Sequence, residues 1–212
     1  MNEFTTTSNV LRAHLVVAPK IDLRSYMVGI CVDLSGPKYT NPVMVSTDGH
    51  RLLVTRIEAS FNGDRGPSHI IPRDLVEIAL KSTTQRKNRD VLVRIDTQER
   101  RVSLAIDGMT FSKNLIDSRF PEYRSVIHAE TSGEPSVINE RYRMDAMKIG
   151  NLLGFNDTYV HMFSNGEKPN RVHVGEGAIH VIMPMRSSNS YKPGEAAKHD
   201  DSWFAEKQES AA

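Results

Sequence analysis

The sequence predicts an α+β fold built from three copies of one unit, strand–helix–strand–strand–strand. Two observations predict it. Short runs of β-branched and apolar residues, bounded by Gly, Pro or Asn, alternate with longer stretches whose apolar residues have helical spacing. This order of elements then recurs along the 212-residue chain, at a spacing of roughly 60 residues. A repeat of this kind indicates units that must pack on their neighbours to bury their apolar faces.

The first unit occupies the N-terminal quarter of the chain. "TSNVLRAHLVVA" has helical spacing, with Ser8 as the expected N-cap and Pro19 after its end. Three expected strands follow, "RSYMVGICVDL", "NPVMVST" and "RLLVTRI". Cys31 lies in the first of them and is the only cysteine, so an internal disulfide is excluded and a small buried hydrophobe is expected.

The second and third units repeat this order. "SHIIPRDLVEIALKS" predicts a strand, Pro72 in a first turn, and a helix with Leu75, Ile78 and Ala79 on one face. "DVLVRID", "RVSLAID" and "MTFSKNLI" are its strands. In the third unit, "SVINERYRMDAMKIGNLLGF" predicts a strand that runs into a helix, and "TYVHMFSN", "NRVHVGE" and "AIHVIMPMR" are the expected strands.

Composition is that of a soluble protein, with 39% hydrophobic and 25% charged residues and a net charge of +1. No apolar run approaches the roughly 20 residues that span a membrane, and "MNEFTTTSNV" lacks the features of a secretory signal. We therefore expect a cytoplasmic protein with no membrane partner. The stretch after Arg186 has an excess of acidic residues, which leaves a small positive excess on the remainder and permits contact with a polyanion.

The stretch "VSTDGHRLLVTRI" predicts a hairpin, because Asp48 and Gly49 tolerate the positive φ that its turn needs. His50 and Arg51 follow at once, and Asp48 with His50 could alternatively serve metal binding or acid–base catalysis. Two ligands one residue apart make a poor metal site, and the other histidines are scattered along the sequence. We therefore expect neither an enzyme, nor a metal site, nor a cofactor.

Three motifs carry a resemblance to a known family: "STDGHRL" (46–52), "FSKNLIDSRFPEYRSVI" (111–127) and "VIMPMR" (181–186). In this order, and embedded in the repeated unit, they resemble the bacterial DNA polymerase III beta sliding clamp. Weaker matches are "IDLRSYMVGICVD", "HIIPRDLVEIAL" and "INERYRMDAM". The resemblance implies a DNA clamp fold, with helices inside a ring and sheets outside.

The resemblance also implies a division of the chain. Residues 1–127 correspond to a complete clamp domain of two units, and 128–186 to half a domain of one unit. The stretch 187–212 is expected to be a disordered tail. A first domain and half of a third have no counterpart in this sequence, so it resembles a short clamp of a kind that a phage or plasmid could encode.

In the family, the inner helices face duplex DNA and contact its phosphates without reading sequence. The matching candidates are basic or polar aromatic residues on or beside the three helices: Arg12, Lys20, Arg24, Tyr26, Arg73, Lys81, Arg141, Arg143 and Lys148. Asp74 stands where the family has a lysine, which weakens this assignment on the second helix. The alternative is that these side chains are ordinary solvated helix faces.

The family also has a pocket that binds short peptide motifs of partner proteins, DNA polymerase among them. Carried over, its residues are Met27, Thr47, Gly49, His50, Arg51, Leu52, Pro121, Ser125, Val126, Pro169, Arg171, Val181, Met183, Pro184, Met185 and Arg186. Ser125 replaces a family arginine. Met and Leu side chains would form an adaptable apolar floor, with His50, Arg51 and Arg186 as rim donors. The alternative for "VIMPMR" is a final core strand, although Pro184 indicates a strand end.

The expected function is therefore that of a sliding clamp, a processivity factor that encircles duplex DNA in replication. Family rings contain twelve units and this chain has three, so a homotetramer is expected, with a clamp loader as a further partner. The alternative is a non-encircling binding module that recruits or sequesters replication, repair or transcription proteins. "DDSWFAE" in the tail is either a recognition motif, an internal ligand for the pocket, or part of a disordered tail.

Overall fold

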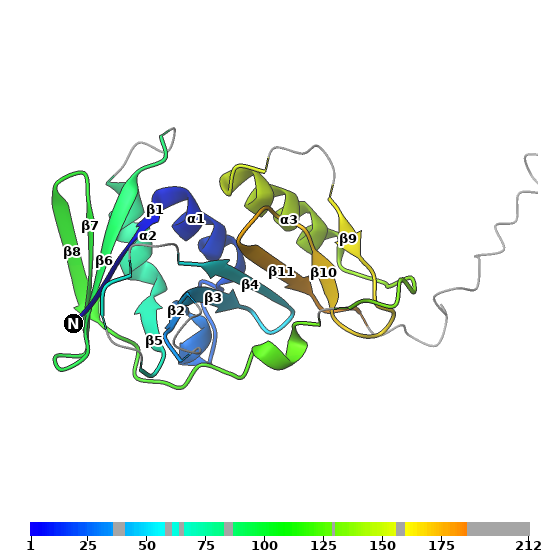
Figure 1. Ribbon diagram of the computed structural model, residues 1–212, viewed down its shortest axis with the longest axis horizontal. Coiled ribbons are helices and arrows are strands. Elements are labelled where there is room, and N and C mark those ends of the chain that lie inside the picture. Colours follow the sequence, from blue (N-terminus) through cyan, green and yellow to red (C-terminus); the bar gives the residue numbers. More distant parts are fainter. Residues whose placement is uncertain are drawn as a thin grey trace, which may run out of the picture.

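The computed structural model describes residues 1–35, 41–57, 61–63, 66–82, 87–128, 130–155 and 160–185 (Figure 1). The expected tail at 187–212 and Arg186 lie outside this part of the chain. The helices are α1 (Ser8–Val17), α2 (Arg73–Lys81) and α3 (Glu140–Leu152), with short 3-10 turns η1 (Ser25–Met27) and η2 (Arg124–Val126). The strands are β1 (Asn2–Thr7), β2 (Gly29–Asp33), β3 (Val43–Thr47), β4 (Arg51–Arg56), β5 (His69–Pro72), β6 (Asp90–Asp96), β7 (Arg101–Ile106), β8 (Met109–Asn114), β9 (Met162–Phe163), β10 (Asn170–Val172) and β11 (Ala178–Ile182).

The strands form two antiparallel sheets. One has four strands in the order β1-β6-β7-β8, and the other has seven in the order β5-β2-β3-β4-β11-β10-β9. The first two units exchange their first strands, since β1 pairs with β6 and β5 pairs with β2. Neither unit can complete its sheet without the other, which agrees with the expectation that the units pack on their neighbours.

The seven-stranded sheet continues from the first unit into the third, because β11 pairs with β4 along its whole length. Helices α1 and α3 lie side by side over this sheet (Figure 1). Ala13 and Val17 of α1 meet Ala146 and Ile149 of α3 in one buried cluster, which Leu53 of β4 also joins. The third unit is therefore attached to the first through both a sheet and a helix pair.

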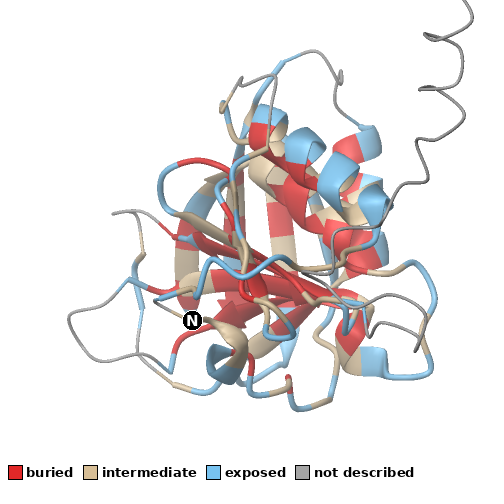
Figure 2. Cartoon of the chain, turned by 90° about the vertical axis from the view of Figure 1, so that its right-hand side faces the viewer, coloured by how far each residue is buried: buried red, intermediate tan, exposed pale blue. Residues whose placement is uncertain are grey.

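A larger core fills the space between the two sheets. Phe4 of β1, Leu11 of α1, Ile30 of β2 and Leu75 of α2 are almost completely buried there, with Val93 of β6 among them. In Figure 2 the buried residues run through the sheets and along the inward faces of the helices, while exposed residues cover the outer helix faces. The predicted helix face of Leu75 and Ala79 is buried as expected, but Ile78 is exposed. Cys31 is buried, as predicted.

Local structure differs from the sequence expectation at three places. Thr7, not Ser8, caps α1, because its Oγ1 accepts the N–H of Val10 (3.4 Å). The run "RSYMVGICVDL" becomes strand only from Gly29, since Ser25–Met27 form η1. In the third unit no strand precedes α3 in the described residues 130–139. A single backbone bond, from the Met185 N–H to the Val137 carbonyl, joins that segment to the end of β11.

Two histidines in the described part of the chain are completely buried. His14 on α1 is hydrogen-bonded through Nδ1 to the Ser46 hydroxyl (2.9 Å) and through Nε2 to the Thr55 hydroxyl (2.8 Å). His180 on β11 donates from Nδ1 to the carbonyl of Leu52 on β4 (2.9 Å). Burial lowers the pKa of His14 to about 3 and that of His180 to about 4. Both side chains are therefore neutral in the folded protein at pH 5, whereas they are protonated in the unfolded chain.

We expect the free energy of unfolding to fall between pH 7 and pH 5. Over this range the unfolded state binds more protons at these histidines than the folded state, so stability decreases as pH falls below the unfolded pKa. Each histidine contributes a loss of about 2 kcal/mol. Urea denaturation at both pH values measures this decrease in the free energy of unfolding, and His14→Gln should remove about half of it. The exposed His161→Gln is the control. An equal loss in His14→Gln and the parent protein would contradict the assignment.

Candidate functional site

Segments far apart in the sequence converge on a cavity of about 180 Å³. The turn η1 supplies Met27, the β3–β4 hairpin supplies residues 47–52, the strap 121–126 runs alongside, and the end of β11 completes the cavity. Its lining consists of Met27, Thr47, Gly49, Arg51, Leu52, Pro121, Glu122, Tyr123, Val126, Val181 and Met183. Leu52 and Val181 lie directly opposite each other in the β4–β11 pairing, so the junction between units forms the floor of this apolar pocket.

The hairpin beside the pocket is held by its own side chains. Gly49 has φ +88°, a conformation that the absence of a Cβ permits. Thr47 Oγ1 accepts the Gly49 N–H (3.0 Å) and donates to the Arg51 carbonyl (2.8 Å). Asp48 Oδ1 accepts the N–H groups of His50 and Arg51, both at 2.9 Å. The Asp48 carboxylate therefore closes the turn, as short acidic side chains commonly do.

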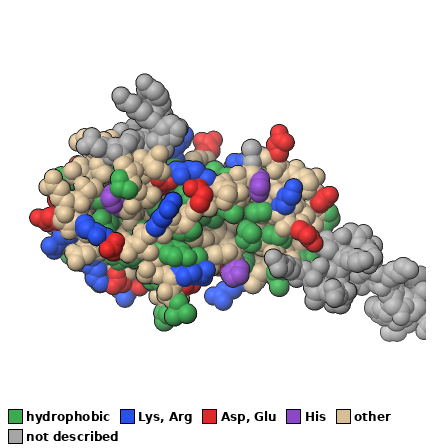
Figure 3. Space-filling model, turned by 90° about the horizontal axis from the view of Figure 1, so that it is seen from below, with side chains coloured by type: hydrophobic (Ala, Val, Ile, Leu, Met, Phe, Trp, Pro, Cys, Tyr) green, Lys and Arg blue, Asp and Glu red, His purple; other side chains and the backbone are tan. Residues whose placement is uncertain are grey.

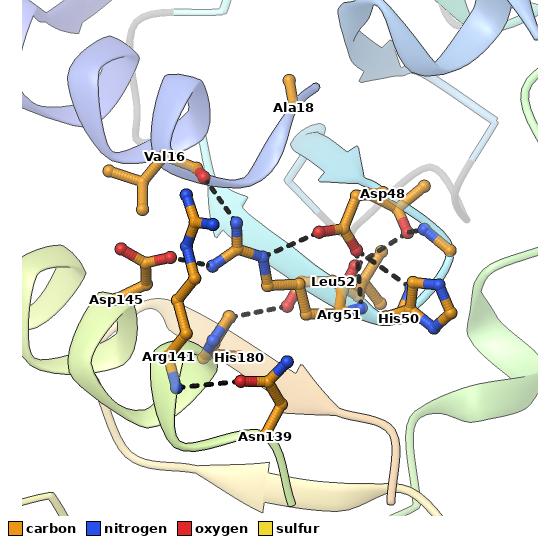
Figure 4. Close-up of polar contacts among 12 residues, drawn as sticks. Val16, Ala18, Asp48, His50, Arg51, Leu52, Asn139, Arg141, Asp145 and His180 are labelled. Atoms are coloured by element: carbon orange, nitrogen blue, oxygen red, sulfur yellow. Dashed lines mark hydrogen bonds and ion pairs between the residues drawn. The ribbon is translucent and has the colours of Figure 1, made fainter. Parts of the chain in front are cut away.

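Arg51 connects this turn to two other parts of the fold (Figure 4). Its Nε donates to Asp48 Oδ2 (2.9 Å), its Nη1 to Asp145 of α3 (2.5 Å), and its Nη2 to the carbonyl of Val16 near the end of α1 (2.9 Å). The guanidinium also lies 4.7 Å from the ring centre of Tyr142 on α3. Arg51 is 9% exposed, so its stem lines the pocket while its charged end joins the hairpin, α1 and α3.

The strap beside the pocket is fixed to β2 by a buried carboxylate. Tyr123 OH donates to Asp33 Oδ2 (2.7 Å), Arg124 Nη2 donates to the same oxygen (2.5 Å), and Ser35 bonds the other oxygen. Burial opposes ionisation of Asp33, but the hydrogen bonds from Ser35 and Tyr123 lower its pKa overall. Since Phe120 and Tyr123 are also buried, the strap has a defined position beside the cavity.

The structure places the remaining expected pocket residues outside this lining. His50 is exposed and stacks on Tyr142, with ring centres 6.4 Å apart. Ser125 is exposed, and its hydroxyl donates to the Glu122 carbonyl. Arg171 lies opposite Val181 across β10 and β11. Pro169, Pro184 and Met185 are likewise absent from the lining, and Arg186 lies outside the described residues. Sequence reasoning missed Glu122 and Tyr123, although they follow Pro121 in the quoted motif.

In Figure 1 the short turn η2 lies at the lower edge of the molecule, below the end of β4. Figure 3 views the molecule from below and shows hydrophobic side chains across the middle of this face, with Lys, Arg and His side chains among them. Arg24 lies beside the hairpin turn. Its guanidinium lies about 3.5 Å from where a Cβ at Gly49 would be, and it is paired with Asp22. Arg24 therefore stands near the pocket turn.

A second hollow, of about 570 Å³, lies among the three helices. Its lining is Arg12, Leu15, Val16, Lys20, Arg73, Glu77, Leu80, Lys81, Lys148 and Leu152. Basic residues predominate over a single acidic residue, Glu77, and that carboxylate accepts a hydrogen bond from Arg73 (2.9 Å). This basic groove collects five of the nine residues expected to face DNA.

These residues differ in whether their charged groups are exposed to solvent or held by hydrogen bonds within the fold. Lys20, Lys81 and Lys148 are exposed. Arg73 is buried, and it donates to the carbonyls of Leu15 and Ala18 as well as to Glu77. Its guanidinium therefore donates hydrogen bonds to carbonyls at the end of α1 and is held within the fold. Of the others, Arg141 and Arg143 are exposed on α3 outside the groove, and Tyr26 is half-buried and packs against the cluster that contains Leu52 and Val181.

Within the described ranges, no group of three or more His, Cys, Asp or Glu side chains could hold a metal ion. No helix in the same ranges is both long and apolar enough to cross a membrane. The candidate site consists of an apolar pocket and a basic groove, and Arg51, which lines the pocket, donates to the carbonyl of Val16, which lines the groove.

A family model described as "DNA polymerase III beta subunit, central domain" matches residues 4–122. The chain belongs to this family. The beta sliding clamp of Pseudomonas aeruginosa is 27% identical over 124 residues, 58% of this chain and 31% of that protein. That of Escherichia coli K12 is 30% identical over 108 residues, 50% of this chain and 27% of that protein. The chain thus spans about a third of the length of the clamp relatives it matches.

Solved clamp structures share the fold over a longer stretch. The Helicobacter pylori beta clamp bound to a DNA ligase peptide matches with a TM-score of 0.64 and 13% identity, covering 88% of this chain and 66% of that one. The DnaN sliding clamp of Bartonella birtlesii bound to griselimycin matches with a TM-score of 0.63 and 18% identity, covering 87% and 66%. The resemblance and the α+β clamp fold predicted from the sequence are confirmed, and the protein is clamp-like.

Proposed function

We propose that this clamp-like protein is a non-catalytic processivity factor that holds DNA polymerase and other proteins on duplex DNA. It binds their short motifs in the apolar pocket and encircles DNA as a ring of several copies. The observation that carries the proposal is the convergence of the hairpin, the strap and the end of β11 on one apolar pocket. A clamp loader is a further expected partner if the ring must be opened.

The pocket suits a short peptide. Apolar side chains form its floor, and methionines at 27 and 183 can repack around different ligands. Arg24 and His50 stand near the rim, where they can donate to carbonyl or carboxylate groups of a peptide. The structural neighbour from H. pylori was solved with a DNA ligase peptide, which supports peptide binding as the use of this fold.

The basic groove suits a polyanion. Lys20, Lys81 and Lys148 are exposed around a hollow with one neutralised carboxylate. Such flexible cations attract phosphates without selecting a base sequence. Helices α1 and α3 lie side by side (Figure 1), so that they can present one continuous surface to DNA.

A closed ring needs more than one copy of the chain, because the described part of one copy supplies three α-helices. Strand β8 ends one sheet and β9 ends the other, and exposed edge strands can pair with another chain. Four copies would supply the twelve units of the family ring, so we propose a homotetramer.

The ring is tested by native mass spectrometry and by retention on DNA. A tetramer that stays on closed circular DNA and leaves it after linearisation supports encirclement, since topological linkage is lost at free ends. A monomer at micromolar concentration, with equal retention on both DNA forms, would overturn it. That result would favour a module that recruits or sequesters partners without encircling DNA.

Replacing Lys20 and Lys148 together with alanine is expected to weaken binding to duplex DNA of any sequence. The slope of log affinity against log salt concentration should decrease by about 2, because each lost phosphate contact removes roughly one released counterion. Fluorescence anisotropy with a labelled duplex at several salt concentrations measures this slope. Lys113 and Lys168, both exposed and away from the groove, provide the matched control. An equal slope change in the control variant would exclude the groove as the contact surface.

A further inference from the structure

A third cavity lies on the other side of the strap. It measures about 460 Å³ and is lined by Cys31, Asp33, Ser35, Pro67, Ser68, Ser118, Arg119, Phe120, Pro121, Glu122, Tyr123 and Arg124. Pro121, Glu122 and Tyr123 line both this cavity and the apolar pocket. The two cavities are therefore neighbours that share one wall, and a single extended peptide could occupy both.

The third cavity differs from the apolar pocket in its chemistry. Arg119 and Arg124 are exposed there, beside the hydroxyls of Ser35, Ser68 and Ser118. Asp33 is bonded by Tyr123, Arg124 and Ser35, and its charge is balanced by that of Arg124. Glu122 is the other carboxylate of the lining and accepts the Arg124 N–H (3.1 Å). The Arg119 guanidinium and the serine hydroxyls can donate to a carboxylate of a ligand. The two cavities thus fit a segment that has an acidic residue close to large apolar ones.

The chain itself contains such a segment. Asp200 and Asp201 precede Trp203 and Phe204, with Ser202 between the two pairs. The covalent connection starts beside the pocket, since Met183 lines it and the Met185 N–H is bonded to the Val137 carbonyl. Residues 186–202 are a connection long enough to return to the pocket from there.

We propose that the segment Asp200–Phe204 is an internal ligand of this site. One of its aromatic side chains occupies the apolar pocket, and one of its carboxylates faces Arg119. The inference rests on the proposed function only in that the pocket binds peptides. A tethered ligand acts at a high effective concentration, so a partner motif binds only by displacing the segment. The tail then selects partners that bind the pocket more tightly than it does.

Trp203 is the only tryptophan, so its fluorescence in the full chain reports this contact directly. We expect a blue-shifted emission maximum that moves to that of exposed tryptophan when a tryptophan-free peptide with two large apolar residues is added. Arg119→Ala should cause part of the same shift. A solvent-like maximum in the parent protein would overturn the proposal. A shift that depends on protein concentration would overturn the intramolecular contact.

The second measurement is the affinity of a labelled peptide of the same kind, by anisotropy. The full chain with Trp203→Ala and Phe204→Ala should bind it about tenfold more tightly than the parent protein, while Tyr191→Ala, elsewhere in the tail, should not change the affinity. Equal binding by all three proteins would overturn the internal ligand and leave the peptide pocket standing. Absence of binding by all three would instead overturn the proposed function of the pocket.

Discussion

Arg51→Met is expected to lower the free energy of unfolding by about 3–5 kcal/mol, the usual cost of removing one partner from a buried ion pair. The guanidinium is bonded to Asp48, Asp145 and the Val16 carbonyl. Without it, two carboxylates that are largely shielded from solvent face each other uncompensated, and the carbonyl of Val16 loses its side-chain donor. Methionine retains the apolar stem that lines the pocket, so the decrease in the free energy of unfolding measures the effect of removing the charged group. Urea denaturation measures the change.

The matched control is Arg100→Met. Arg100 also pairs with a carboxylate, that of Asp117, but the pair is exposed, so its loss should cost under about 1 kcal/mol. Equal effects of the two substitutions would contradict a structural role for Arg51. Asp145→Asn should give part of the Arg51→Met effect, because it removes one of the two carboxylates. Peptide affinity should fall in both Arg51 and Asp145 variants, since the hairpin is no longer held against α3.

The sequence predicted the hairpin but not the use of Arg51. Asp-Gly between β-rich runs is a local signal, and the turn forms where it was expected. We expected Arg51 to donate to a ligand at the rim. Its guanidinium instead bonds Asp145, which is far away in the sequence, and periodicity contains no information on such a contact. Arg73 is a similar case, because a basic residue on a helix gives no sign that its side chain caps another helix.

The order of elements was predictable, but their pairing was not. Residue patterns located the helices and most strands, since apolar spacing follows the local geometry of each element. The exchange of β1 and β5 between units, and the pairing of β4 with β11, depend on which edges meet in space. The repeat predicted a strand before α3 in the third unit. The described residues of that segment form no strand there, and Val137 accepts one backbone hydrogen bond from Met185.

Val126→Glu is expected to weaken binding of a peptide with two large apolar residues by about a hundredfold, or roughly 3 kcal/mol. Val126 lies on η2 and lines the pocket without being fully buried, so a charge there can reach solvent in the free protein. In the complex the peptide would cover it and desolvate the carboxylate. The fold should therefore remain stable while binding is lost. Anisotropy with a labelled peptide and urea denaturation measure the two quantities.

Met109→Glu and Val126→Ile are controls that distinguish peptide binding in the pocket from general effects of charge and of side-chain shape. Met109 is an exposed hydrophobic residue on β8, away from the pocket, so its substitution should leave peptide affinity unchanged. Val126→Ile keeps an apolar wall and should change affinity by less than about fivefold, since a volume change of one methylene costs about 1 kcal/mol or less. Undiminished binding by Val126→Glu would show that the peptide occupies another surface. Equal losses in Met109→Glu and Val126→Glu would show that the charge acts at long range and that the pocket is not the contact.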